Sequence, residues 1–129
     1  MNTELTYLTL VSAFTALIWI PYILNEIMVR GVTDAVGYPP NPKPLAPWAE
    51  RMKKSHYNAV ENLVVFGALV LIAQDVGVSN SATVTACIVY FWARVAHTIV
   101  YTFAIPWLRT IAFVVGFVCQ MTLAWQILA

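Results

Sequence analysis

The sequence predicts an all-α integral membrane protein, built as an up-and-down bundle of four membrane-spanning helices. Of its 129 residues, 60% are hydrophobic and only 10% are charged, whereas about 25% of residues are charged in ordinary soluble domains. Apolar runs recur along the chain, and most are long enough to cross the roughly 30 Å of hydrocarbon in a bilayer. We expect a single domain over residues 1–129, with no low-complexity segment.

The four spans are predicted at about 5–29, 51–75, 80–102 and 106–128. The second is unusual, because only the part that begins at Leu63 is apolar. About a dozen apolar residues are too few to cross a bilayer alone, so the polar first half must also lie in the membrane. Polar side chains are tolerated at that depth where they face other helices. We therefore expect the second helix to be covered by its neighbours.

The charge distribution predicts the orientation of the bundle. All seven basic residues fall at one end, where the first and second spans and the third and fourth spans are joined. By the positive-inside rule this end is cytoplasmic, and both termini lie on the opposite side. The connection at 31–49 contains five of the seven prolines and is expected to be an irregular cytoplasmic loop that docks on the bundle. Nothing in the charge pattern indicates nucleic-acid binding.

Polar stripes mark one face of the second helix and one face of the third. At about 100° of rotation per residue, the members on the second helix fall within an arc of about 120°. They are Arg51, Lys54, Ser55, Asn58, Glu61 and Asn62. The members on the third helix are Tyr90, Arg94, His97 and Tyr101, spaced by 4, 3 and 4. Arg94 and Glu61 lie at similar depths, and we predict an ion pair between them, because an unpaired buried charge is very costly.

Two interpretations of these stripes stay open. In the first, Asn58, Asn62 and Glu61 hold the helices together through interhelical hydrogen bonds. The surplus of cations instead indicates an anionic ligand, because only Glu50 and Glu61 accompany them locally. The residues concerned are Arg51, Lys54, His97, Tyr101 and Arg109. For two of them a structural role is the alternative: Arg109 as an interfacial anchor, and His97 as a hydrogen-bonded core residue.

The two cysteines, Cys87 and Cys119, lie in apolar runs without the spacing of a metal site. We interpret them as buried structural thiols and predict no metal.

Two stretches of the sequence resemble those of a known family. "ERMKKSHYNAVENL" is similar to the pattern E-R-x-x-x-x-H-x-N-x-x-E, and "ARVAHTIVYTFAIPWLR" to R-x-x-H-x-x-x-Y…P…R. Both patterns are those of the membrane-associated proteins in eicosanoid and glutathione metabolism, the MAPEG family. The resemblance covers essentially the whole chain. It implies a homotrimer of four-helix subunits, with glutathione as co-substrate in clefts between subunits on the cytoplasmic side.

The resemblance also implies roles for individual residues. The positions that match the family's glutathione site are Arg51, Asn58, Glu61, Arg94, His97, Tyr101 and Arg109, with Arg30 as a looser match. Lys54, a further cation beside Arg51, is expected from its charge to help bind the anion. Glutathione has two carboxylates, a free amine suited to Glu61, and a thiol that must become a thiolate before it reacts. A cationic donor at the sulfur favours the thiolate, and we assign this catalytic role to Arg109, assisted by Thr110 or Tyr101.

Three positions depart from the best-known relatives. The best-known relatives share additional basic residues in the motif of the second helix, where this chain has Lys54 and Tyr57. Some relatives also have a hydroxyl at the position of Phe113, which has none. We therefore expect a general glutathione transferase or peroxidase that acts on lipophilic electrophiles from the bilayer. The alternative is a non-catalytic membrane protein of the same fold that binds lipids or a partner. An ion pathway through Glu61 and Arg94 is disfavoured, because the charges occupy only one half of the bundle.

Overall fold

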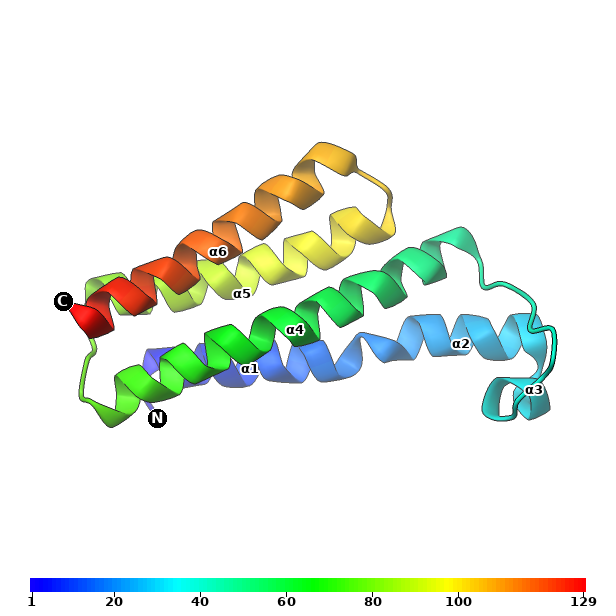
Figure 1. Ribbon diagram of the computed structural model, residues 1–129, viewed down its shortest axis with the longest axis horizontal. Coiled ribbons are helices and arrows are strands. Elements are labelled where there is room, and N and C mark those ends of the chain that lie inside the picture. Colours follow the sequence, from blue (N-terminus) through cyan, green and yellow to red (C-terminus); the bar gives the residue numbers. More distant parts are fainter.

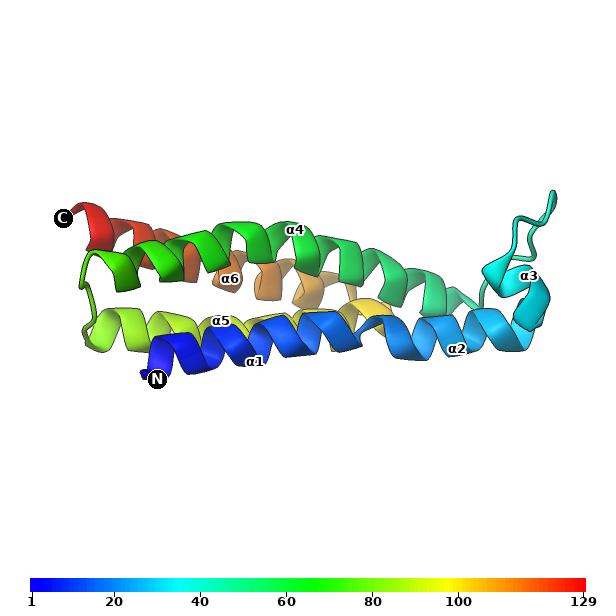
Figure 2. The same ribbon diagram turned by 90° about the horizontal axis from the view of Figure 1, so that it is seen from below.

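The computed structural model describes residues 1–129 and contains helices but no strands. The helices are α1 (Thr3–Leu17), α2 (Trp19–Arg30), α3 (Val32–Val36), α4 (Pro47–Asp75), α5 (Ser81–Thr102) and α6 (Pro106–Leu128). Four helical segments are long and apolar enough to cross a membrane: α1 with α2, α4, α5 and α6. They run alternately up and down in one bundle (Figures 1 and 2). The predicted all-α, four-helix membrane bundle is confirmed.

The first span is broken at Ile18, where the sequence predicted one helix over 5–29. Pro21 explains the break. It has no N–H to donate to the carbonyl of Leu17, and its ring crowds that carbonyl. At the break, the N–H of Ile18 donates to the carbonyl of Thr15, only three residues earlier, at 3.4 Å. The two pieces, α1 and α2, nevertheless run nearly in line (Figure 1).

The connection at 31–49 is more ordered than predicted, because it contains α3 and α4 begins within it. Proline suits the first position of a helix, where its missing N–H has no partner to lose, and α4 accordingly begins at Pro47 rather than near residue 51. Side chains of α2 and α4 hold the part of the loop that leads into α4. Arg30 Nε donates to the Lys43 carbonyl (2.7 Å), and Asn25 Oδ1 and Glu50 Oε1 accept from the N–H groups of Ala46 (3.0 Å) and Leu45 (3.2 Å).

The main core lies between α4, α5 and α6 and is closed by α1. At its centre the rings of Phe66 and Tyr90 stack with centroids 3.7 Å apart, and Cys87 and Cys119 are buried beside them. A second, smaller cluster lies where α2 meets α4, around Tyr22.

At the end of the bundle that carries the two termini, polar contacts join the helices in pairs. The buried carboxylate of Glu4 accepts hydrogen bonds from the hydroxyls of Ser79 (2.6 Å) and Thr83 (3.1 Å). The N-terminus of α5 is adjacent, and its dipole also favours the negative charge. Asn2 donates to Gln74 at 2.6 Å and Asn80 to Gln126 at 2.9 Å, which links α1 to α4 and α5 to α6. At this end the polar groups satisfy one another.

The contact between Tyr22 and His56 gives a test of the fold. The Tyr22 hydroxyl and His56 Nδ1 are hydrogen-bonded at 2.8 Å, and Tyr22 is buried. Tyr22→Phe removes this bond while keeping the ring, and should lower the free energy of unfolding in detergent by about 1 kcal/mol. Tyr38→Phe is the matched control, because Tyr38 is fully exposed. Equal effects of the two substitutions would show that the bond does not hold α2 against α4.

Candidate functional site

Arg94 is the largest fully buried side chain and lies in the half of the bundle that carries the basic residues. It is only 1% exposed. Its Nη2 donates to Asn58 Oδ1 at 2.7 Å and, more weakly, to His97 Nδ1 at 3.4 Å. Its Nε and Nη1 have no hydrogen-bond partner in the chain. The guanidinium is therefore held by neutral groups, which leave its positive charge uncompensated.

The predicted ion pair between Arg94 and Glu61 does not form. The one ion pair within the chain joins Arg30 to Glu26, and Glu61 is exposed on α4. Helical geometry explains the error. Glu61 lies at the edge of the polar arc on α4, about 60° around the helix from Asn58, so that Asn58 faces α5 while Glu61 points outward. Lys54, close to the same edge, is exposed as well.

Arg109, in the first turn of α6, lies against Tyr101 of α5. Its Cζ is 4.6 Å from the centroid of the Tyr101 ring, a cation–π contact that leaves the guanidinium N–H groups available. The rings of His97 and the same tyrosine form a T-shaped contact with centroids 5.5 Å apart. Arg51 reaches this region from α4, where its Nε donates to the carbonyl of Thr102 at 2.9 Å. A cation commonly occupies this position at the C-terminus of a helix.

Two small cavities adjoin the pair formed by Tyr101 and Arg109. One, of about 200 Å³, is lined by Arg51, Val100, Tyr101, Ala104, Ile105, Pro106 and Arg109. The other, of about 180 Å³, is lined by Asn58, His97, Tyr101, Arg109, Thr110 and Phe113. Because both cavities share Tyr101 and Arg109, these two side chains lie at the centre of a single polar region.

The structure brings together most of the residues predicted for the site. Those that line the two cavities are Arg51, Asn58, His97, Tyr101, Arg109 and Thr110. Arg94 lies behind them, in contact with Asn58 and His97. Three predicted residues lie elsewhere: Lys54 and Glu61 on the exposed side of α4, and Arg30 beside Glu26 and the loop.

Two residues near the site were not anticipated from the sequence. Ala104 lines one cavity in a left-handed conformation, with φ of 60°, and backbone geometry of this kind cannot be read from an alanine. Gln120 of α6 donates to Asn62 of α4. It carried a signal that was overlooked, because it is a buried polar residue eleven positions after Arg109 and therefore on the same helical face.

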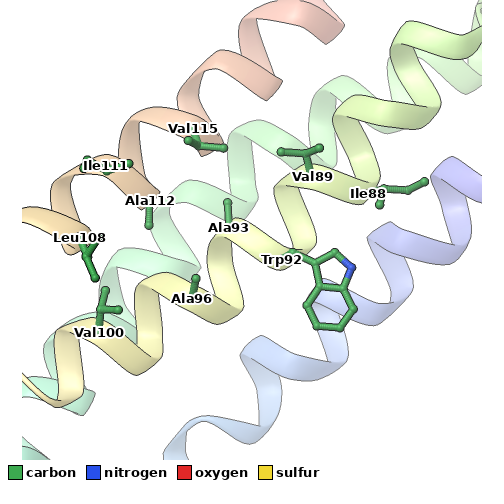
Figure 3. Close-up of a pocket in the computed structure, with 10 residues that line it drawn as sticks. All are labelled: Ile88, Val89, Trp92, Ala93, Ala96, Val100, Leu108, Ile111, Ala112 and Val115. Carbon is green, nitrogen blue, oxygen red and sulfur yellow. The ribbon is translucent and has the colours of Figure 1, made fainter. Parts of the chain in front are cut away.

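An apolar groove runs between α5 and α6, and Figure 3 shows the side chains that line it. Its volume is about 400 Å³, and all ten lining residues are hydrophobic. Two of them adjoin the polar site: Val100 also lines the cavity beside Arg51, and Leu108 immediately precedes Arg109. An apolar surface therefore leads to the cationic end of α6.

A family model for the MAPEG family matches residues 7–129, nearly the whole chain. The chain belongs to the MAPEG family. No individual curated protein matches it. As a MAPEG protein with four apolar helices, it is an integral, multi-pass membrane protein of the family that serves glutathione and eicosanoid metabolism, and its outer surface contacts lipid.

Asn58 provides a test of how Arg94 is held. Asn58→Leu removes the acceptor of the 2.7 Å bond and leaves a buried guanidinium poorly satisfied, so the free energy of unfolding should fall by about 2 kcal/mol. Asn58→Asp keeps an acceptor oxygen and adds a countercharge, and should cost much less. The measurement is denaturation of both variants in the same detergent. The Asp variant unfolding as easily as the Leu variant would contradict this account of Arg94.

Proposed function

We propose that this MAPEG protein is a glutathione-dependent transferase or peroxidase that acts on lipophilic electrophiles taken from the membrane. The observation that carries the proposal is the surplus of positive charge at the two cavities. Arg51 and Arg109 line them, and Arg94 lies behind them in contact with Asn58 and His97. None of the three forms an ion pair within the chain. Such a surplus in a membrane bundle favours an anionic ligand.

The residues present fit glutathione. Its two carboxylates require cationic donors, and Arg51 of α4 lines one of the cavities. Arg94 is buried behind the second cavity and supplies positive charge there, while Asn58 and His97, which it contacts, line the cavity wall. Glutathione is thus proposed to bind with its charged groups toward α4 and α5.

Arg109 is proposed to be the residue that activates the thiol. A guanidinium beside the sulfur stabilises the thiolate relative to the thiol, because it places positive charge and N–H donors at the developing anion. Arg109 lies over the face of Tyr101, which restricts the directions in which its donors point. The hydroxyls of Tyr101 and Thr110 are the assisting donors on this side of the cavities.

The proposed electrophile reaches the sulfur along the groove between α5 and α6. The groove is lined only by hydrophobic side chains, so it suits an acyl chain or an aromatic body. It ends next to Arg109, which would bring a membrane-dissolved substrate to the thiolate. The lipophilic substrate would thus approach from the bilayer while the peptide-like thiol is held by the polar cavities.

We further propose that the protein assembles as a homotrimer, with Glu61 completing a cleft between subunits. Glu61 lies near the middle of α4 and is exposed in the single chain, where it would face hydrocarbon. An ionised carboxylate facing lipid is costly, whereas a second copy packed on this side of α4 would cover it. There Glu61 is proposed to bind the glutathione amine.

We also propose an orientation in the membrane: the basic end of the bundle faces the cytoplasm, and both termini lie on the opposite side.

A non-catalytic role in binding lipids or a partner remains the second candidate. It is favoured by Phe113, which gives one cavity wall no hydroxyl, and by the exposed position of Lys54. The two candidates differ in whether a thiolate forms.

Substitution of Arg109 distinguishes them. Arg109→Ala should abolish the thiolate absorbance near 240 nm on mixing with glutathione and lower turnover of a lipophilic electrophile by about 100-fold or more. Arg30→Ala is the matched control, because Arg30 pairs with Glu26 away from the cavities, and its turnover should match that of the unmodified protein. The same thiolate signal in Arg109→Ala would exclude the assigned role, and no signal in any form would favour the non-catalytic candidate.

The role of Glu61 is tested with a glutathione analogue that lacks the α-amine. Glu61→Gln should weaken glutathione binding by about 10- to 100-fold, the range expected for loss of a charge-assisted hydrogen bond. The same substitution should leave binding of the analogue nearly unchanged, because the analogue has no amine to pair. Titration calorimetry on the detergent-solubilised protein measures both. An equal loss for the two ligands would show that Glu61 acts on the assembly rather than on the amine.

A further inference from the structure

A buried polar node joins the three helices that carry the proposed site. Asn62 Oδ1 on α4 accepts hydrogen bonds from the Tyr90 hydroxyl on α5 at 2.9 Å and from Gln120 Nε2 on α6 at 2.7 Å. Gln120 Nε2 also lies 3.2 Å from the backbone carbonyl of Asn62. Tyr90 and Gln120 are both buried, and the Tyr90 ring is stacked on Phe66 of α4.

The node lies on the same face of each helix as the site, one or more turns deeper. On α4, Asn62 follows Asn58 by one turn, and on α5 Arg94 follows Tyr90 by one turn. On α6, Gln120 and Arg109 are separated by eleven residues, so they point within about 20° of each other and are about 16 Å apart along the axis. The node and the site thus lie on the same polar faces of these helices, at two different depths in the bundle.

For α6 this connection matters more than for its neighbours. Apart from Arg109 and Thr110 in its first turns, the half of α6 nearest the site has only apolar residues. The small residues Ala112 and Gly116 are buried there, with Gly116 against Tyr90 and Arg94 of α5, while bulkier apolar side chains face outward. Close packing of this kind has no hydrophobic driving force in a bilayer, because lipid is as apolar as the helix interface. A hydrogen bond from Gln120 to Asn62 determines the rotation and height of α6, because an unpaired amide in hydrocarbon is costly.

We infer that Gln120 is a positioning residue that orients Arg109 toward the glutathione sulfur through its bonds to Asn62. The inference rests on the proposed function of Arg109. Gln120 itself is too deep to touch the ligand, because it lines neither cavity. It acts by holding α6 at one rotation against α4, where Asn58 and Arg94 form the opposite side of the site.

The consequence is specific to the step that uses Arg109. Glutathione should still be bound through Arg51 and the Arg94 side when Gln120 is replaced, because Tyr90 continues to donate to Asn62 and keeps α5 joined to α4. Only the placement of α6 is loosened. Loss of Gln120 should therefore reduce thiolate formation and kcat much more than it weakens glutathione binding.

The test compares two glutamines on the same helix. Gln120→Leu should lower the thiolate absorbance near 240 nm and kcat by about 10-fold, with less than about a 3-fold change in the Kd for glutathione. Gln126→Leu is the control. It breaks the bond from Asn80 at the far end of α6 and should leave the thiolate signal, kcat and Kd unchanged. If Gln120→Leu does not fold, Gln120→Met, which also lacks the N–H donor, takes its place.

A second readout does not depend on glutathione. In a Thr110→Cys background, the rate of maleimide labelling should change by about 3-fold or more when Gln120→Leu is added, because α6 shifts at the level of the cavities. The native Cys87 and Cys119 are buried, so maleimide should label them only slowly. Unchanged labelling together with unchanged kcat overturns the inference. Failure of the unmodified protein to bind glutathione would instead overturn the proposed function, and the labelling result would still decide whether Gln120 positions α6.

Discussion

A positive charge buried among helices in a bilayer sets the constraint on which the arrangement of α4, α5 and α6 depends. The Arg94 side chain is 1% exposed and forms no ion pair with a carboxylate. Its hydrogen-bond acceptors are therefore neutral groups from α4 and α5. Asn58 comes from α4 and His97 from the next turn of α5. Because these acceptors do not cancel the charge, the half of the bundle that contains the cavities at Tyr101 and Arg109 carries uncompensated positive charge.

The two ends of the bundle handle polar groups in opposite ways. At the end with the termini, Glu4 is satisfied by two hydroxyls, and amide pairs link the helices there. Around Arg94 two guanidinium nitrogens and the hydroxyls of Thr98 and Thr102 are buried without a partner. Buried polar groups in folded proteins are nearly always paired. The unpaired set therefore lies where we propose that the ligand binds, whereas the paired set joins the helices at the opposite end.

Much of this architecture follows from the sequence because hydrophobic length and helical periodicity are strong signals. Run lengths predicted the four spans, and periodicity placed Arg51, Asn58 and His97 on faces that do converge. Periodicity does not state how each helix is rotated against its neighbour, however. A shift of about 60° decides whether Arg94 meets Asn58 or Glu61, and the prediction chose the wrong one. The break at Ile18 was missed although Pro21 signals it, because the run around it is uniformly apolar.

The unequal lengths of the helices determine where the site lies in the membrane. With 22 and 23 residues, α5 and α6 are about 33 to 35 Å long, close to the thickness of the hydrocarbon. The first span and α4, with 28 and 29 residues, are roughly 10 Å longer, and Figures 1 and 2 show α2 and the start of α4 extending past the turn between α5 and α6. Tyr101 and Arg109 flank that turn, so helices of this length would place them near the boundary between water and hydrocarbon. A water-soluble thiol and an oil-soluble electrophile would meet there without either having to leave its own solvent.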